Sequence, residues 1–374
     1  MQKYFLPRQL HPFAWWGWAL ALAAAASTTT NPLFLAGIIG VASLVAFARR
    51  GGGPWGNAFK LYLMLGAFIV VLRVVFRIIF GGGDGPTILF ELPRIPLPEV
   101  ARGIRLLGPV SLESVLYGLY DGLRLAAMII CIGAANSLAN PKKLLANLPG
   151  ALYELGTVMV VTVSALPQLG DSLQRVMRAR KLRTTAVAKT RRQKLRAVET
   201  IIIPVLSDAL ERSMSLAASM DVRGYGRAGQ ASKADRWATA TLALLSFGLL
   251  AVWAFRFLAG SPDRSFLGIP LLSTALLLAG LGAAGLALRI SGRTAQRTQY
   301  RPIKWQAPET VTVAAGLIAV GIVLWLANIG DPTALFPAIT PFEWPELTVP
   351  LLVVLLAAAL PAFLTPPPHL ASTP

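Results

Sequence analysis

The sequence predicts an all-α polytopic membrane protein with about eight transmembrane helices and a pair of long helices on the cytoplasmic side. The 374 residues are 55% hydrophobic and 14% charged, and their mean hydropathy is +0.61. Soluble proteins carry about 25% charged residues, so this composition indicates a membrane protein. A transmembrane helix needs roughly 20 mostly apolar residues. The apolar segments that approach this length are 13–27, 32–48, 58–80, 114–137, 237–258, 267–288, 310–328 and 349–365.

The net charge of +18 is compatible with two classes of protein. A nucleic-acid-binding protein can carry such an excess. In a membrane protein, the same excess is typical of loops held on the cytoplasmic side. The hydropathy favours the second class, so we expect the lipid bilayer as a partner and no nucleic acid.

The distribution of charge along the chain predicts the orientation of the spans. Lys3 and Arg8 precede the first span, and residues 289–304 carry five Lys or Arg and no acid. The loop 329–348 instead carries three acids and no base. Because basic loops stay in the cytoplasm, we expect a multi-pass protein of the cell membrane with both termini inside and residues 329–348 outside.

Three regions follow from this orientation. Residues 1–138 are expected to form the N-terminal membrane helices, with a Gly- and Pro-rich external loop or re-entrant segment at 81–113. Residues 139–236 are expected to form a cytoplasmic region. Residues 237–374 are expected to form the C-terminal membrane helices.

The apolar stretch 148–167 decides the topology. If it crossed the membrane, residues 168–236 would face outward, although they carry fifteen Lys or Arg against six acids, a net charge of +9. That location would contradict the positive-inside pattern. We therefore expect a helix that lies along or dips into the cytoplasmic face and ends at Pro167. The alternative is that 148–167 is an ordinary span and that one of the other predicted spans is miscounted.

Two helical patterns fill the cytoplasmic region, at 168–183 and 198–223. The second carries a continuous apolar stripe with helical spacing, made of Ile202, Leu206, Leu210, Ser213, Ala217 and Met220. The small residues Ala209, Ser213 and Ala217 would let another helix cross closely. The polar linker 184–194 between the patterns is either a site for anionic lipid headgroups or a solvated loop.

Both helical patterns finish with a small or branched apolar residue followed by arginine. The first ends in Ala179, Arg180 and Lys181, and the second in Val222, Arg223 and Gly224. Gly224 suits the left-handed conformation just past a helix C-terminus, and arginine there interacts favourably with the helix dipole. Two helices with basic C-caps would explain each motif alone. Because the arginine motif occurs on both helices, we favour the interpretation that both helix ends contact a partner protein.

At these residues the chain resembles a known family, the transmembrane T component of energy-coupling factor (ECF) transporters, which import vitamins and metal ions. The similarity lies in four stretches, namely "ARK" (179–181), "VRGYG" (222–226), "NPKKLLANLPG" (140–150) and "RTQYRP" (297–302). The resemblance implies a coupling subunit that transmits the motion of two cytoplasmic ABC-type ATPases to a separate substrate-binding membrane subunit, the S subunit. It implies no catalysis and no cofactor in this chain.

In that family two crossed coupling helices end in Ala-Arg-Gly-like triplets, and each arginine enters an acidic groove on one ATPase. Carried over, Arg180 and Arg223 would be the docking residues. Two positions depart from the pattern, because Lys181 stands where Gly is frequent and Val222 where Ala is usual. The predicted spans 237–258, 267–288 and 349–365 are additions whose role the sequence does not reveal.

Charged residues inside the predicted spans form a second candidate site. Asp121 lies about 12 Å below the outer boundary of its span, at 1.5 Å per residue, and Arg73 about 10 Å below that of the preceding span. The two spans are antiparallel, so these side chains can meet. Arg124, one turn beyond Asp121, competes for the same carboxylate. We expect a cluster of Arg73, Asp121 and Arg124 that fixes helix packing; a substrate or proton path is the alternative.

Two other function classes remain as alternatives. A membrane enzyme acting on lipids or isoprenoids would be expected to show clustered Asp residues, and a self-sufficient permease several polar groups within its spans. The sequence has no P-loop pattern.

The residues that most often bind metal ions are few and far apart in the sequence. They are one cysteine, Cys131, and two histidines, His11 and His369, so we expect no metal site. The sequence does not identify the transported substrate.

Overall fold

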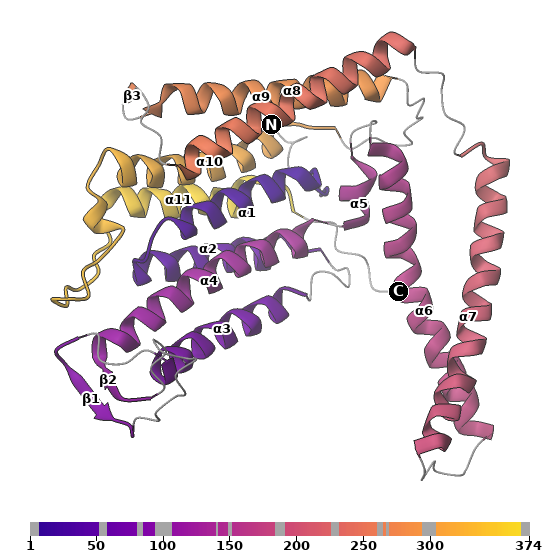
Figure 1. The fold of residues 1–374 in the computed structure, drawn as a ribbon, viewed down its shortest axis with the longest axis horizontal. Coiled ribbons are helices and arrows are strands. Elements are labelled where there is room, and N and C mark those ends of the chain that lie inside the picture. Colours follow the sequence, from indigo (N-terminus) through magenta and orange to yellow (C-terminus); the bar gives the residue numbers. More distant parts are fainter. Residues whose placement is uncertain are drawn as a thin grey trace. The chain divides into compact units, whose positions relative to one another are not determined.

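The computed structural model describes residues 7–51, 58–80, 85–93, 107–139, 141–148, 152–183, 191–225, 232–259, 265–266, 269–293 and 304–367. Helices dominate these residues (Figure 1). The chain divides into two compact units. Unit 1 comprises residues 1–144 and 301–374, and unit 2 comprises residues 145–300.

Unit 1 is a helical bundle built around one long helix. The helix α4 (Leu112–Leu138) packs against α1 (Pro12–Ser27), α2 (Pro32–Arg49) and α3 (Ala58–Phe80). The helix α10 (Ala307–Asn328) packs on α1, and α11 (Val349–Leu364) contacts both α10 and α2. Three short elements complete its described part, the antiparallel pair β1 (Ile88–Glu91) and β2 (Pro109–Ser111) and the 3₁₀ turn η5 (Pro332–Ala334).

Small residues allow α4 to approach α3 closely. A Cβ at Gly118 would lie 3.0 Å from the Cβ of Arg77, and one at Gly122 would lie 3.0 Å from the Cα of Val70. Glycines four residues apart are a recurrent packing device between membrane helices, because they let two backbones come together. This contact places the side chains of α3 directly beside those of α4.

At each end of the helical bundle of unit 1, polar contacts join residues near the start of the chain to residues near its end. At one end, the Asn31 amide caps α2 and donates to the carbonyl oxygens of Ala334 and Glu346. At the other end, the Arg49 guanidinium donates to the carbonyl oxygen of Ala362. These bonds tie the two ends of α2 to segments that lie some 300 residues later in the chain.

A buried ion pair fastens the N-terminal segment to α10. Both terminal nitrogens of Arg8 donate to the two carboxylate oxygens of Glu309, at 2.8 and 2.9 Å. The Glu309 side chain is fully buried. It also accepts hydrogen bonds from the backbone N–H groups of His11 and Gln306. The carboxylate therefore has several donors, as a buried charge requires.

The described residues of unit 2 form four long helices in two pairs. The helix α6 (Tyr153–Arg183) packs on α7 (Arg191–Val222), and α8 (Lys233–Leu258) packs on α9 (Leu271–Arg293). The Ser246 hydroxyl of α8 donates to the carbonyl oxygen of Gly280 in α9, at 2.9 Å. The two-residue strands β3 (Ser265–Phe266) and β4 (Ile269–Pro270) close this second hairpin. Along the chain, unit 1 gives way to unit 2 within the short helix α5 (Pro141–Ala146).

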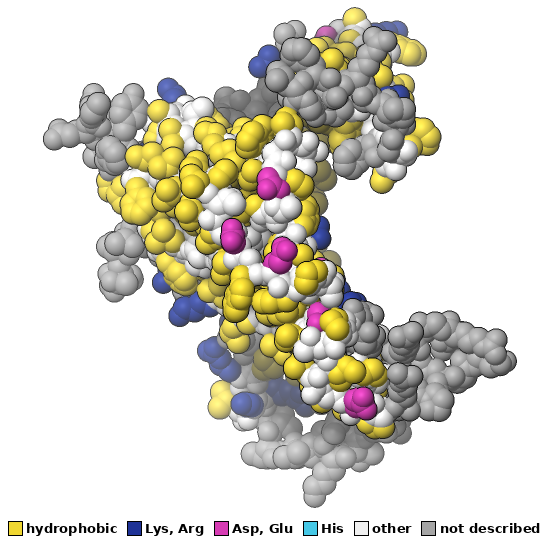
Figure 2. Space-filling model, turned by 90° about the vertical axis from the view of Figure 1, so that its left-hand side faces the viewer, with side chains coloured by type: hydrophobic (Ala, Val, Ile, Leu, Met, Phe, Trp, Pro, Cys, Tyr) yellow, Lys and Arg dark blue, Asp and Glu magenta, His cyan; other side chains and the backbone are white. Residues whose placement is uncertain are grey.

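The predicted fold class is confirmed. Each of the eight predicted spans corresponds to a helix, and six of these, α2, α3, α4, α8, α9 and α10, are long and apolar enough to cross a membrane. The helices α1 and α11 have 16 residues each, which at 1.5 Å per residue is about 24 Å. Hydrophobic side chains cover most of the described surface on the side drawn in Figure 2, with scattered acids between them.

Two expectations about helix boundaries are wrong. The stretch 148–167 does not end at Pro167, because α6 continues through this proline as one helix of 31 residues. The second pattern begins at Arg191 rather than at 198, so the end of the polar linker is helical, and Pro204 lies inside α7. The described helix α6 is not among the helices apolar enough to be candidate spans.

Candidate functional site

One carboxylate organises the contact between α6 and α7. Asp208 of α7 accepts hydrogen bonds from the Ser172 hydroxyl (2.5 Å) and the Arg175 guanidinium (3.2 Å), both on α6, and from Arg212 one turn further along α7 (2.8 Å). Ser172 is buried at this crossing. The hydrogen bond from Ser172, followed by the charges of Arg212 and Arg175, holds the pKa of Asp208 below its ordinary value. The crossing therefore uses the polar side of α7.

The first predicted docking motif lies inside a helix. Because α6 extends to Arg183, as the pattern 168–183 predicts, Ala179, Arg180 and Lys181 occupy its last turns. Ala179 and Lys181 are exposed, and Arg180 is half-buried. The arginine is thus held at a fixed position on a helical surface.

The second motif forms a helix cap. The helix α7 ends at Val222, and Gly224 has the left-handed φ of 73°, as the sequence predicts. The N–H of Gly224 donates to the carbonyl of Asp221, and the N–H of Tyr225 donates to that of Met220. This is the Schellman arrangement. It fixes the chain direction at Arg223, which is exposed.

The two motifs lie on opposite sides of the crossing. Figure 1 shows that α7 runs back alongside α6. Arg180 is eight residues beyond Ser172, and Arg223 is fifteen residues beyond Asp208. At 1.5 Å per residue these intervals are about 12 and 22 Å. Since α6 and α7 run in opposite directions from their contact, Arg180 and Arg223 lie on opposite sides of it.

The apolar faces of the α6–α7 pair are largely exposed. The stripe predicted on α7 remains uncovered, with Leu206 56% and Leu210 64% exposed. On α6, Leu166 is 63% exposed and Leu173 40%. Exposed apolar surface of this extent marks a site for another protein or for lipid. The small residues Ser213 and Ala217, expected at a close crossing, are exposed as well.

The predicted intramembrane charges are brought together only in part. The guanidinium of Arg73 lies 3.1 Å from the carboxylate of Asp121, joining α3 to α4. Arg124 turns elsewhere and donates to the backbone carbonyl of Ser27 at the end of α1. The three charges therefore connect three helices. The competition between Arg124 and Arg73 for one carboxylate, which the sequence leaves open, is resolved in favour of Arg73.

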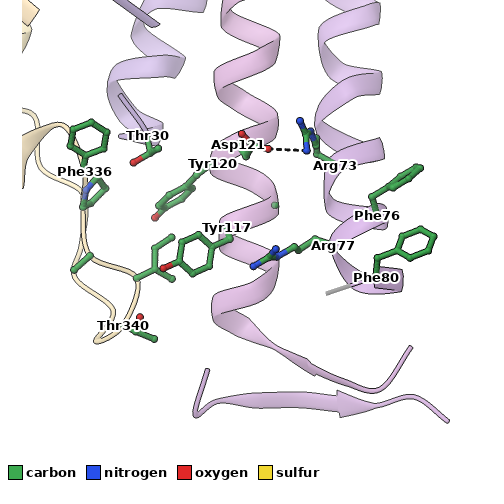
Figure 3. Close-up of a pocket in the computed structure, with 14 residues that line it drawn as sticks. Thr30, Arg73, Phe76, Arg77, Phe80, Tyr117, Tyr120, Asp121, Phe336 and Thr340 are labelled. Atoms are coloured by element: carbon green, nitrogen blue, oxygen red, sulfur yellow. Dashed lines mark ion pairs between the residues drawn. The ribbon is translucent and has the colours of Figure 1, made fainter. Parts of the chain in front are cut away.

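A pocket of about 910 Å³ opens beside this ion pair (Figure 3). Its walls come from α3, α4, the loop that follows η5 and Thr30, which precedes α2. Figure 3 shows Arg73 beside Asp121 and Arg77 beside Tyr117, while Tyr120 extends from the side of α4 away from α3. The guanidinium of Arg77 lies 5.6 Å from the centre of the Tyr117 ring, a cation–π distance. The cluster expected from the sequence does not include Arg77 or the two tyrosines. Arg77 lies one turn from Arg73, Tyr117 lies one turn from Asp121, and Tyr120 directly precedes Asp121.

No group of three or more His, Cys, Asp or Glu side chains that could hold a metal ion occurs among the described residues. Cys131 is buried in α4. His11 caps α1, and His369 lies outside the described residues. Ion pairs between described residues occur at the crossing of α6 and α7, at Glu309 and in the pocket.

Sequence comparison decides the family. The profile of the cobalt transport proteins, CbiQ, matches residues 7–234. The chain belongs to this family. The matched region includes α1 to α4 and both helices of the crossed pair, and it ends at the start of α8. The stretch "RTQYRP" lies beyond this match and outside the described residues.

Curated relatives of this family member carry one description, energy-coupling factor transporter transmembrane protein EcfT. The Macrococcus caseolyticus protein is 29% identical over 185 residues, which cover 48% of this chain and 67% of the relative. The Leuconostoc gelidum protein is 26% identical over 203 residues, covering 48% of this chain and 74% of the relative. The Streptococcus equi protein is 24% identical over 200 residues, covering 52% and 72%. These matches indicate transport rather than catalysis.

Proposed function

We propose that this chain is the transmembrane coupling subunit of an ATP-driven ECF-type importer. In this role it hydrolyses no ATP itself and relays the motion of two cytoplasmic ATPases to a separate S subunit that binds a vitamin or a metal ion. The observation that carries the proposal is the crossed pair α6–α7, which lies within the family match and has an arginine motif beyond the crossing on each helix.

Arg180 and Arg223 are the docking residues in this proposal. A guanidinium presents a planar fork of donors that fits a carboxylate with two hydrogen bonds. Ala179 and Lys181 flank the first arginine, and Val222 and Gly224 flank the second, so these four residues would line the contacts. Because the arginines lie about 12 and 22 Å from the crossing in opposite directions, each engages a different ATPase.

The crossing at Asp208 makes the two helices act together. When one ATPase moves one arginine, the contacts of Asp208 with Ser172 and Arg175 transfer the movement to the other helix. The exposed apolar stripes of the pair face the S subunit, which would cover them. In this proposal the S subunit determines which substrate is transported.

Replacing both arginines by alanine tests the proposal. Truncating one partner of a buried charge contact costs about 2–5 kcal/mol, so Arg180→Ala with Arg223→Ala should abolish uptake and weaken copurification with the ATPases. Lysine at both positions should rescue poorly, because it lacks the fork. Membrane insertion should be unchanged.

Arg178→Ala is the matched control. Arg178 lies on α6 two residues before Arg180 and is exposed, whereas Arg180 is half-buried. Arg178 donates to Gln174, and its loss should leave uptake intact. Normal uptake by the double variant would contradict the assignment of the docking residues.

The cytoplasmic position of residues 139–236 is part of the same proposal. Single cysteines placed at positions 144 and 190 should both react with a membrane-impermeant thiol reagent only from the cytoplasmic side. The native Cys131 is fully buried and gives little background. Labelling of position 190 from outside would overturn the topology and, with it, the docking of ATPases on α6 and α7.

A further inference from the structure

The pocket between α3, α4 and the loop after η5 has a defined depth in the bundle. Arg77 lies three residues and Arg73 seven residues before the end of α3 at Phe80, which is about 5 and 10 Å along the helix axis. This end of α3 is opposite the end where Tyr62 accepts a hydrogen bond from Asn136. The hydrocarbon core of a bilayer is about 30 Å thick, and the headgroup regions add 5–8 Å on each side. The pocket therefore lies where headgroups meet acyl chains.

The charge of the pocket favours an anion. Its lining contains two arginines and one aspartate, and thus a net charge of +1. The pair of Arg73 and Asp121 is half-exposed, with 49% and 45% of the two side chains accessible. A guanidinium has five donors, so Arg73 can contact Asp121 and a phosphate at the same time. The hydroxyls of Thr30 and Thr340 also line the space (Figure 3).

The remaining walls are apolar and aromatic. Phe76 and Phe80 lie one turn apart on α3 with ring centres 5.5 Å apart, and they are 52% and 47% exposed. They flank the arginines on the same stretch of helix, and Phe336 lines the pocket on the loop side. A free anion would leave these rings without contacts, whereas an amphiphile would cover them with its chains.

We propose that this pocket binds one anionic phospholipid, with its phosphate at Arg73 and Arg77 and its chains along Phe76 and Phe80. The bound phosphate offsets the net positive charge of the lining residues, at a depth where charge is costly. The lipid also bridges α3 to the loop 336–340. This inference does not depend on the coupling function, because it rests on unit 1 alone.

The test uses the full chain purified in mixed micelles of neutral detergent and phosphatidylcholine. Phosphatidylglycerol is titrated in, and the lipid retained per protein is counted by native mass spectrometry. The wild-type chain should retain one phosphatidylglycerol in preference to phosphatidylcholine. Arg77→Gln should weaken retention about fivefold, the factor that corresponds to roughly 1 kcal/mol per basic residue near a lipid surface. Arg77→Lys should keep most of it.

Lys60→Gln is the control, since Lys60 is an exposed cation at the other end of α3, and it should retain lipid as the wild type does. An equal loss in the Lys60 and Arg77 variants would overturn the site. Equal retention of the two lipids by the wild-type chain would overturn the role of charge, and this measurement requires no variant. Displacement of the lipid by glycerol phosphate at equal concentration would overturn the role of the acyl chains.

Discussion

Unit 1 and the α6–α7 pair are built in opposite ways. In unit 1, large side chains such as Trp18, Phe34 and Phe59 are completely buried, and polar groups close the bundle at both ends. The α6–α7 pair has one polar crossing at Asp208, and its large apolar side chains are mostly exposed. Unit 1 therefore contains most of its own packing partners, whereas the α6–α7 pair leaves most of its large apolar side chains uncovered.

The difference separates stability from function in this protein. Substitutions inside unit 1 should lower the stability of the chain itself. Substitutions on α6 and α7 should change assembly and transport while the chain stays folded. Three substitutions of single carboxylates test this comparison, one in the core of unit 1, one in its pocket and one at the crossing.

The largest effect is expected for Glu309→Gln. It leaves the guanidinium of Arg8 without its bidentate partner. Breaking a fully buried ion pair typically costs about 3–5 kcal/mol, and the side chain of Arg8 is 22% exposed, so this range is an upper bound for the loss. Denaturant titration of the purified chain should show this loss. Glu343→Gln, which changes an exposed acid, is the control. Equal stability of the two variants would mean that the Arg8–Glu309 pair does not hold unit 1 together.

A smaller loss is expected for Asp121→Asn. Polar contacts between membrane helices contribute about 0.6 kcal/mol on average and at most about 1.7, and the pair with Arg73 is half-exposed. The purified complex should unfold a few degrees earlier, at about 2–4 °C per kcal/mol. The pH dependence of transport per assembled complex should be unchanged. A fully stable variant with a shifted pH profile would show that Asp121 carries protons.

The smallest effect is expected at the crossing, and it depends on pH. Because the folded pKa of Asp208 is lowered from the ordinary value of 3.8, its stabilising contribution is complete above that value. The contribution is lost as the pH falls through the lowered pKa. The wild-type chain should therefore lose more stability between pH 6 and pH 3 than Asp208→Asn does. Asp171→Asn, an exposed acid on α6, should behave like the wild type.

The sequence was sufficient wherever one local rule acts alone. Gly224 was placed correctly at the cap of α7 because glycine adopts a left-handed φ without strain. Arg73 and Asp121 were paired correctly by counting residues along two antiparallel helices. The family was identified from the motifs at 179–181 and 222–226, and the match to residues 7–234 confirms it.

Long-range contacts were harder to predict. The break expected at Pro167 is absent, because a proline removes one hydrogen bond but does not prevent a helix from continuing. Glu309 was overlooked because its partner Arg8 lies 301 positions earlier. Its one local signal was an acid three residues after Gln306, as in a capping box. The pocket joins residues from four separate stretches, so sequence spacing alone could not define it.

The separation of Arg8 from Glu309 also sets the order in which the protein can be completed. Ribosomes add about 5–20 residues per second, so the 301 positions between these partners take about 15–60 s to synthesise. During that time α1 and α2 are already made, while α10, which supplies Glu309, and α11, whose Ala358 accepts the hydrogen bond of Trp18, are not. The helices α1 and α2 therefore lack their packing partners α10 and α11 until the whole of unit 2 has been synthesised.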